Sequence, residues 1–244
     1  MLAALLVAAR CLFARRILRL VFWPVLGAIV AWGVIAGVFW HAWVRLIQHA
    51  VDMPWLASLL GQTATAAIGG AVAWLVALPL VALAVLATAL AVVATIGMPA
   101  MVEEIAGRYY PAVARRHGGT LRGSTANALS AVALYALLML LSVPLWFLVP
   151  VGGVLLPLLL NGWLNVRLFR YDALSAHASR EEYAAVLRRV SGRAFMLGLA
   201  LAGLQLLMSS TLVLIPAVLF LLPVFSGLAF VHLLLGDLAR LRAV

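Results

Sequence analysis

The chain has 244 residues, of which 67% are hydrophobic and 10% are charged, and its mean hydropathy is +1.18. This composition excludes an ordinary water-soluble domain and a disordered chain, and it indicates a single membrane domain over 1–244. The 17 cationic residues are all arginine, against 7 acids, and they lie in short segments between apolar runs. We interpret the net charge of +10 as contact with anionic lipids and orientation in a membrane, not as nucleic-acid binding.

Residues suited to catalysis or metal binding are sparse. The single cysteine, Cys11, excludes an intramolecular disulfide and a cysteine cluster, and no histidine pair has metal-ligand spacing with a third ligand nearby. The sequence contains no nucleophile elbow, P-loop or dinucleotide-binding glycine motif. We therefore expect neither an enzyme nor a metal or cofactor site.

The first two predicted elements lie before residue 45. Segment 1–19 combines Leu and Ala with four arginines, which predicts either an interfacial helix or the cytoplasmic start of the first span. The uncharged run 20–44 is 25 residues long and predicts the first transmembrane helix. On this helix Gly33 and Gly37 form a GxxxG ridge, which suits close packing of another helix. Glycine is also frequent in membrane helices without such a role.

The longest uncharged stretch, 53–102, decides the topology. Its 50 residues are too many for one plain crossing of about 20 residues and awkward for two. One crossing places all four arginine-rich segments on one side, which the positive-inside rule assigns to the cytoplasm together with both termini. The expected helix, 62–98, would be about 55 Å long, so it must tilt, kink at Pro79 or project beyond the bilayer. The four segments are 1–19, 103–128, 167–193 and the C-terminus.

Two later uncharged runs, 124–166 and 194–236, are each 43 residues long. Each begins and ends beside an arginine-rich segment, so each predicts a helical hairpin. The turns carry no charged side chain, which favours hairpins that stop inside the membrane over complete crossings. The expected breakers are Pro144, Pro150, Gly152, Gly153 and Pro157 in the first run and Pro216 and Pro223 in the second.

The expected fold class is therefore an all-α integral membrane protein. It has two long transmembrane helices and two Pro-broken hairpins, which either penetrate the membrane partly or complete six spans. Between the hairpins lies the polar segment 167–193, where the capping-box spacing of Ser179 and Glu182 predicts a short helix through Arg193. A loop is expected at 115–119.

The uncharged, broken helices favour an anion as ligand, because no acidic residue lies inside an expected span. Backbone N–H groups at broken helices, amides and hydroxyls would contact it. The candidates are Gly97, Pro99 and Ala100 after the long helix, Gly152, Gly153, Asn161 and Asn165 in the first hairpin, and Gln205, Ser209, Ser210 and Thr211 in the second. Each also has a simpler interpretation as helix punctuation or interhelical packing. We interpret His232 as a hydrogen-bonded residue at a helix interface.

The order of these segments resembles the CysZ-like family, also called the etoposide-induced-protein domain family, over nearly the whole chain. The resemblance implies a bacterial inner-membrane protein that supports sulfate uptake for cysteine synthesis, so its partner would be an inorganic oxyanion. It also implies two long spans, two hemi-penetrating hairpins and a homo-oligomer. The stretches that carry it are Asn161-Gly162-Trp163-Leu164 with 169–174, Leu222 to His232, and Arg108-Tyr109-Tyr110-Pro111, the last as in the bacterial branch.

The sequence departs from that family at one predicted contact. Sulfate-handling members carry a Phe-Asn-Gly-like turn after the proline that ends the second long helix, whereas here Pro99 is followed by Ala100 and Met101. The side-chain amide is lost, so an anion contact there would rely on backbone N–H groups. We expect an inner-membrane anion permease, with a non-transporting membrane scaffold or envelope-assembly factor as the alternative.

Overall fold

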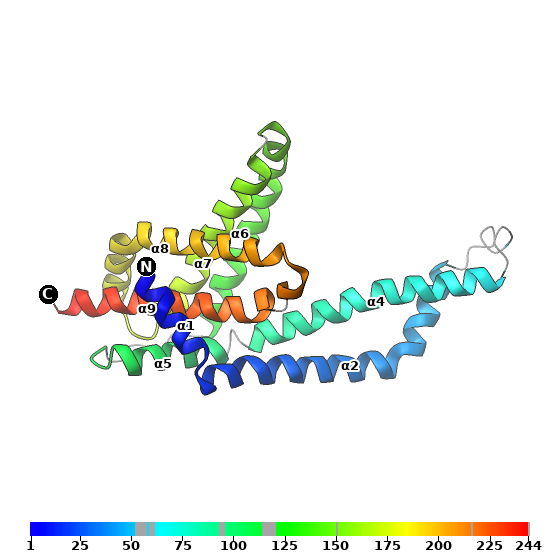
Figure 1. Cartoon of the computed structure of the whole chain (residues 1–244), viewed down its shortest axis with the longest axis horizontal. Helices are drawn as coiled ribbons and strands as arrows, with labels where there is room; N and C mark the ends of the chain where they lie inside the picture. The colour runs from blue at the N-terminus through cyan, green and yellow to red at the C-terminus, as the bar shows by residue number, and fades with distance from the viewer. Residues whose placement is uncertain are drawn as a thin grey trace. The chain divides into compact units, whose positions relative to one another are not determined.

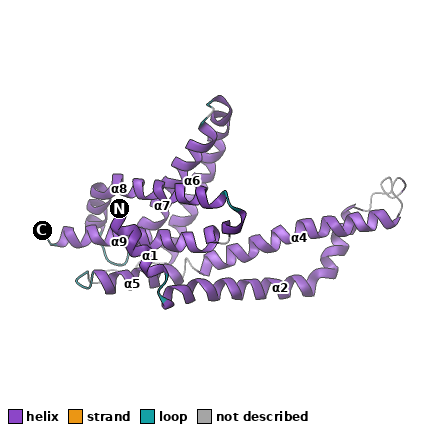
Figure 2. Ribbon diagram, viewed as in Figure 1, coloured by secondary structure: helices purple, strands orange, loops and turns teal. Residues whose placement is uncertain are grey.

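The computed structural model describes residues 1–51, 58, 62–92, 96–113, 121–149, 151–215 and 217–243. Within these ranges the chain forms eight α-helices, a 3₁₀ turn and a π turn, and contains no strand (Figure 2). Six of the helices are long and apolar enough to cross a membrane. The predicted all-α fold is therefore confirmed. Pro150, Pro216 and the loop expected at 115–119 lie outside the described residues.

The chain divides into two compact units, and one of them is Phe22–Val92. This unit contains most of α2 (Arg15–Val51) and all of α4 (Gln62–Val92). Trp32 Nε1 donates a hydrogen bond to Thr88 Oγ1 at 3.0 Å, and further along α2 the ring of Trp40 lies 4.2 Å from that of Trp74. The order of these two contacts makes α2 and α4 an antiparallel pair (Figure 1).

Helix α2 is longer than the expected span 20–44. It has 37 residues and extends past both ends of that span, whereas α4 is described over the 31 residues Gln62–Val92 of the expected 62–98. Pro24 lies inside α2 and Pro79 inside α4, and neither proline ends its helix. Prolines are tolerated in this way in membrane helices, where neighbouring groups satisfy the carbonyl that the ring leaves unbonded.

The other unit, Met1–Val21 with Val93–Val244, is arranged around α9 (Leu222–Arg242). Helix α9 packs against α1 (Leu2–Leu12), α5 (Met98–Tyr109), α7 (Gly152–Leu174) and α8 (Arg180–Ser209). In the most apolar window of α9, 67% of the residues are buried, against 33% in α8 and 11% in α7. A helix that is covered on several sides is apolar around most of its circumference, as α9 is.

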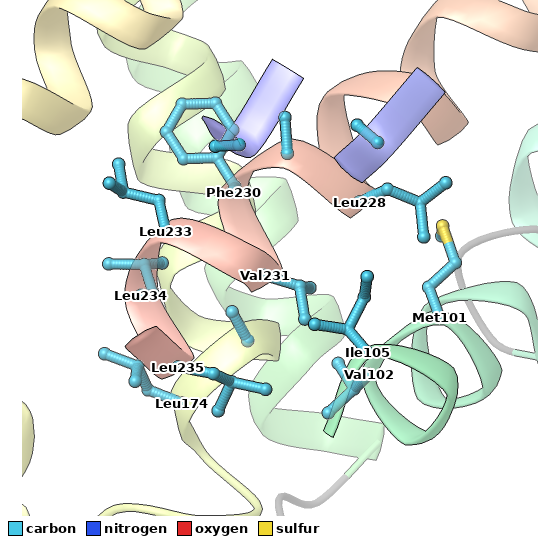
Figure 3. Close-up of a cluster of buried hydrophobic side chains, with 14 of the residues drawn as sticks. Met101, Val102, Ile105, Leu174, Leu228, Phe230, Val231, Leu233, Leu234 and Leu235 are labelled. Atoms are coloured by element: carbon cyan, nitrogen blue, oxygen red, sulfur yellow. The ribbon is translucent and has the colours of Figure 1, made fainter. Parts of the chain in front are cut away.

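The core of this unit consists of apolar side chains that α9 and its neighbours supply at helical spacing. Leu228 of α9 lies beside Met101 of α5 (Figure 3). One turn further, Val231 of α9 lies beside Ile105 of α5 (Figure 3). The ring of Phe230, on another face of α9, stacks on Phe169 of α7 with centroids 5.5 Å apart. Contacts of this kind hold helices together in lipid, where removal of apolar surface from water no longer contributes.

The N-terminal segment forms α1, a bend at 13–14 and the first residues of α2. Ala4, Ala8 and Cys11 are the buried residues of α1, and their spacing places them on one face. Arg10 lies outside this face and is exposed. Helix α1 therefore packs against α9 through small side chains, with its arginine directed elsewhere.

The two predicted hairpins are present, with α6 (Leu121–Leu148) and α7 forming the first and α8 and α9 the second. Pro144 and Pro157 lie inside α6 and α7, so the first turn falls between the end of α6 at Leu148 and the start of α7 at Gly152. Pro223 lies in the first turn of α9, directly after the π segment Ala217–Leu221. The second turn includes the 3₁₀ segment Leu212–Leu214 and the π segment Ala217–Leu221.

The capping box at the start of α8 is confirmed. Ser179 Oγ accepts a hydrogen bond from Glu182 N at 3.2 Å, and Ser179 N donates to Glu182 Oε2 at 2.8 Å. The short helix expected to end near Arg193 is wrong, because α8 continues to Ser209. The Arg193 guanidinium pairs with Asp237 Oδ1 on α9 at 2.8 Å, so its charge is compensated within the bundle and the helix need not end there.

Candidate functional site

The first predicted anion contact lies where α5 begins. Gly97 is buried and precedes the helix, Pro99 lies in its first turn and Ala100 is partly buried. Met98 packs against Gly227 of α9, where an added Cβ would lie 3.2 Å from Met98 Sδ. The start of α5 is therefore fixed to α9 by close packing, and the N–H groups of its first turn provide the partial positive charge that anions favour.

The second predicted contact, at the start of α7, is already engaged within its own hairpin. Gly152 N donates to Val149 O at 2.8 Å, and an added Cβ at Gly152 would lie 2.7 Å from Leu145 O. Asn161 Nδ2 donates to Pro157 O at 2.9 Å. The glycine is therefore required by the turn itself, and the Asn161 amide bonds to the carbonyl four residues before it.

The structure does not bring these two contacts together. Within their unit, the turn between α6 and α7 projects away from α5 (Figure 1). Gly153, in that turn, faces Trp146 of α6, whose Cβ would lie 3.7 Å from an added Cβ. Asn165 is partly buried, and the candidates in the second hairpin, Gln205, Ser209, Ser210 and Thr211, are all exposed.

The predicted packing ridge on α2 is uncovered within the described chain. A Cβ added at Gly33 or Gly37 would meet no atom within 4 Å. Both glycines are exposed, and so are their neighbours Val34 and Val38. Within the unit Phe22–Val92, α4 therefore does not make the close approach that the ridge permits.

Sequence reasoning missed a partly open pocket that α7, α8 and α9 line. Its volume is about 220 Å³, and its polar lining consists of Arg167 and Arg170 from α7 and Ser191 from α8. Apolar side chains complete the wall, with Phe230 of α9 among them. The guanidinium carbon of Arg167 lies 5.6 Å from the ring centroid of Trp163, within the range of a cation–π contact.

The two pocket arginines have buried donors without acceptors. The Nε atoms of Arg167 and Arg170 are buried, and neither has a hydrogen-bond partner within the described part of the chain. A buried N–H that lacks an acceptor costs about 1–3 kcal/mol. Because guanidinium donors match the oxygens of carboxylates, phosphates and sulfates, the chemistry that this arrangement suits is oxyanion binding. The signal in the sequence was two arginines three residues apart, one turn of the same helix face.

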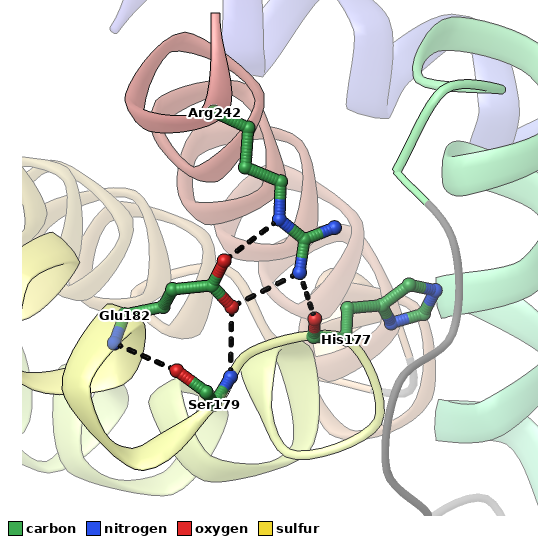
Figure 4. A network of polar contacts seen from close by, with 4 residues as sticks. All are labelled: His177, Ser179, Glu182 and Arg242. Atoms are coloured by element: carbon green, nitrogen blue, oxygen red, sulfur yellow. Dashed lines mark hydrogen bonds and ion pairs between the residues drawn. The ribbon is translucent and has the colours of Figure 1, made fainter. Parts of the chain in front are cut away.

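A polar network fixes two walls of this pocket to each other (Figure 4). Arg242 near the end of α9 donates to both carboxylate oxygens of Glu182 in α8, from Nε at 2.9 Å and from Nη2 at 3.0 Å. Arg242 Nη2 also donates to the backbone carbonyl of His177 at 2.6 Å. Glu182 therefore caps α8 and anchors α9 at once, which holds the two helices at a fixed spacing.

A second polar contact joins the end of α5 to α9. Tyr110 Oη lies 3.1 Å from His232 Nδ1 and 3.2 Å from the His232 carbonyl, to which it donates. The interpretation of His232 as a hydrogen-bonded interface residue is confirmed. Burial raises the pKa of the Tyr110 phenol, so this donor keeps its proton at neutral pH.

Ion pairs also connect the N-terminal segment to α5. Arg16 Nη2 lies 3.3 Å from Glu103 Oε2, and Arg16 Nη1 lies 3.7 Å from Glu104 Oε2. The arginine-rich segment 1–19 and the start of the segment 103–128 therefore lie together.

The model of one protein family, described as Sulfate transporter CysZ/Etoposide-induced protein 2.4, matches residues 4–223. The match includes α7, which provides both pocket arginines, and α8, and it ends in the first turn of α9. No significant match to the chain was found among curated proteins or among solved structures.

Proposed function

Because this multi-pass membrane chain belongs to the sulfate transporter CysZ/Etoposide-induced protein 2.4 family, we propose that it is an inner-membrane permease for an inorganic oxyanion, with sulfate as the leading substrate. The family match over residues 4–223 is the observation that carries this proposal. We propose that the protein is not an enzyme and works without a cofactor. Six helices long enough to cross a membrane supply the framework that a permease needs.

The proposed mechanism is passage of a partly desolvated oxyanion along backbone N–H groups and hydroxyls. Gly97, Pro99 and Ala100 would contact it at the start of α5. Gly152, Gly153 and Asn161 would contact it on the first hairpin. Arginines at the cytoplasmic ends of the helices would raise the local concentration of anions.

We propose that both termini lie in the cytoplasm of a bacterial cell. The positive-inside rule supports this orientation, because the arginine-rich segments lie at the ends of helices. The contacts Arg16–Glu103 and Arg242–Glu182 support it further, since they join segments that a single orientation must place on the same side. Anionic lipids of the inner leaflet are the expected partners of the exposed arginines.

We propose that the protein forms a homo-oligomer whose subunits pack through Gly33 and Gly37 on α2. The observation that favours this is the uncovered ridge, at which an added Cβ meets nothing within 4 Å. The same observation favours the second candidate function, a non-transporting membrane scaffold or envelope-assembly factor. That candidate predicts purification together with a different protein and no oxyanion movement.

Uptake of radiolabelled sulfate into liposomes containing the purified protein tests the proposal. We expect uptake that saturates with sulfate and is inhibited by an excess of unlabelled sulfate but not of chloride. Liposomes with heat-inactivated protein are the control. Uptake no faster than in protein-free liposomes would remove sulfate transport from consideration and leave the scaffold as the better candidate.

A further inference from the structure

We propose that the pocket between α7, α8 and α9 binds one tetrahedral oxyanion, held by Arg167 and Arg170. The oxyanion is either free, as in sulfate, or the phosphate of an anionic lipid headgroup. Both sources present the same chemistry to the arginines, which is a negative group with several acceptor oxygens. Neither arginine belongs to the anion contacts predicted from the sequence, so this site is distinct from the route at α5 and the first hairpin.

The arrangement of the two arginines supports this assignment. They are three residues apart on α7, which places them on the same face one turn apart. Both Nε donors are buried, and within the described chain both lack an acceptor. An oxyanion in the pocket would give an acceptor to the two guanidinium groups that line it, whereas an apolar ligand would not.

The surroundings of the arginines leave their charge available. No described residue that lines the pocket is acidic, and neither arginine forms an ion pair with a described carboxylate. By contrast, Arg193 and Arg242 in the same unit are each paired with an acid on a neighbouring helix. The cation–π contact with Trp163 holds the Arg167 guanidinium without neutralising it.

The shape and lining of the pocket agree with this ligand class. A volume of about 220 Å³ exceeds the roughly 30 Å³ share of a single water. The wall is otherwise apolar, with Phe195 and Phe230 among the lining residues. A low-polarity wall strengthens an arginine–oxyanion contact, because apolar side chains lower the effective dielectric around the charges.

A pair of binding titrations on the full-length protein in a neutral detergent tests the proposal and separates the two sources. The first adds sodium sulfate, with sodium chloride at matched ionic strength as the control. The second adds short-chain phosphatidylglycerol, with phosphatidylcholine of the same chain length as the control. We expect saturable thermal stabilisation by at least one of the two probes and none by its control. Sulfate alone identifies a free-anion site, and phosphatidylglycerol alone identifies a headgroup site.

Substitutions locate the binding in the pocket. The variant with both Arg167→Gln and Arg170→Gln is expected to bind the active probe at least about tenfold more weakly, because it loses two charge-assisted hydrogen bonds. Arg189→Gln, which removes an exposed charge from α8, is the matched control and is expected to bind as the wild type does. Ser191→Glu introduces an acid at an exposed pocket position and is expected to abolish binding, with Ser191→Gln as its size control.

If the double arginine variant does not fold, the comparison of Ser191→Glu with Ser191→Gln still tests whether the probe binds in the pocket. The proposal is overturned if neither probe binds to the wild type, or if the folded variants bind as tightly as Arg189→Gln. Only the choice of sulfate as a probe rests on the proposed function, so the two fail separately. Binding at this pocket without sulfate uptake into liposomes would support the proposed site and contradict the proposed permease function. Uptake without such binding would support the permease function and contradict the site.

Discussion

Composition alone suggests a single role for the arginines, which is contact with anionic lipids. In the structure, arginine has at least three different roles. Arg193 and Arg242 pair with acids on neighbouring helices, and Arg16 pairs with two acids of α5. Arg167 and Arg170 line a pocket and keep buried donors without an acceptor in the described chain. The proposed anchoring to anionic lipid would involve the exposed arginines only. The role of each arginine is therefore set by what the fold places opposite it.

Glu182 is the residue whose loss should damage the α8–α9 contact most. Its carboxylate completes the capping box and accepts two hydrogen bonds from Arg242. Glu182→Ala is expected to lower the free energy of unfolding by about 2–4 kcal/mol, as the sum of a lost helix cap and lost charge-assisted hydrogen bonds. Thermal unfolding in detergent measures this. Glu181→Ala, an exposed acid in the same first turn, is the control, and equal losses in the two variants would contradict the role given to Glu182.

Cys11 is the only cysteine and should report on the packing of α1. The side chain is fully buried, and burial raises the pKa of its thiol, an effect that the nearby Tyr109 hydroxyl opposes only partly. We expect iodoacetamide at pH 8 to modify native protein far more slowly than protein unfolded in dodecyl sulfate. Labelling at the unfolded rate would show that α1 does not pack as described.

The same pKa shift gives a pH dependence of stability. Because the folded-state pKa lies above the unfolded value of about 8.5, the native state favours the neutral thiol. The stabilisation is therefore complete below about pH 8.5 and is lost as the pH rises through the folded pKa. We expect the wild type to lose more thermal stability between pH 8 and pH 10 than Cys11→Ala does. The comparison reports on Cys11 together with Tyr109, whose pKa the thiol helps to raise, while the raised pKa of Tyr110 is common to both proteins.

At the scale of the helices, glycine determines the contacts more than proline does. Pro24, Pro79, Pro144 and Pro157 all lie inside helices that continue past them. Helices α7 and α8, in contrast, cross where Gly198 meets the backbone carbonyl of Gly162, a contact that leaves no room for a Cβ at Gly198. Gly162 belongs to the stretch that carries the family resemblance, and this crossing gives a physical reason for a glycine there.

Gly198→Leu is expected to separate α7 from α8. A side chain there must displace the Gly162 backbone, at a cost of about 1–3 kcal/mol. Gly203→Leu is the matched control on the same helix, because an added Cβ at Gly203 meets nothing within 4 Å. Thermal unfolding compares the two variants, and the first should also lose any binding in the pocket, of which α7 and α8 are two walls. Similar melting of both variants would mean that the crossing tolerates a larger residue.

The hairpins could be predicted from the sequence because charge-free runs between arginine-rich segments constrain them to return. The capping box at Ser179 could also be predicted, because Ser179 and Glu182 are only three residues apart in the sequence. The continuation of α8 past Arg193 could not be predicted, because the compensating Asp237 is 44 residues away in the chain. The pocket was missed for a related reason. The spacing of Arg167 and Arg170 shows a shared helix face but not that α8 and α9 cover it.

At the scale of the whole molecule, α2 and α4 are the helices whose apolar windows have the lowest buried shares among the candidate spans. No residue in the most apolar window of α4 is buried within the chain, and 6% of those in the window of α2 are. Lipid covers apolar side chains well, but it does not require glycines to be aligned. The ridge at Gly33 and Gly37 is therefore the part of this surface where a second copy of the chain is expected to pack.

Gly37→Ile is expected to shift the purified protein toward the monomer. The added side chain would obstruct close approach of another helix, yet it meets no described atom of its own chain. Light scattering after size-exclusion chromatography in detergent measures the change. Gly27→Ile is the control, because Gly27 is equally open but lies about 80° around the helix from Gly37 and about 120° from Gly33. An unchanged oligomer in Gly37→Ile would place the interface elsewhere.

The depth of the two hairpins is linked to this assembly. Val151 and Val213, at the two turns, are 62% and 83% exposed within one chain. Irregular backbone at membrane depth is tolerated only where protein or water covers it. Turns that stop inside the membrane therefore require cover from another copy, whereas turns that cross completely are covered by water. The hemi-penetrating arrangement and the oligomer should consequently be found together.

Cysteine labelling distinguishes the two arrangements. Val151→Cys and Val213→Cys are made separately with Cys11→Ala and exposed to a membrane-impermeant maleimide, in whole cells and in inverted vesicles. Partial penetration predicts no labelling from either side for both turns, even though neither is buried within its own chain. Arg189→Cys is the positive control and should react in inverted vesicles only, because the positive-inside rule places it in the cytoplasm. Rapid labelling of both turns in whole cells would instead establish six complete crossings, and the turns would then need no second copy to cover them.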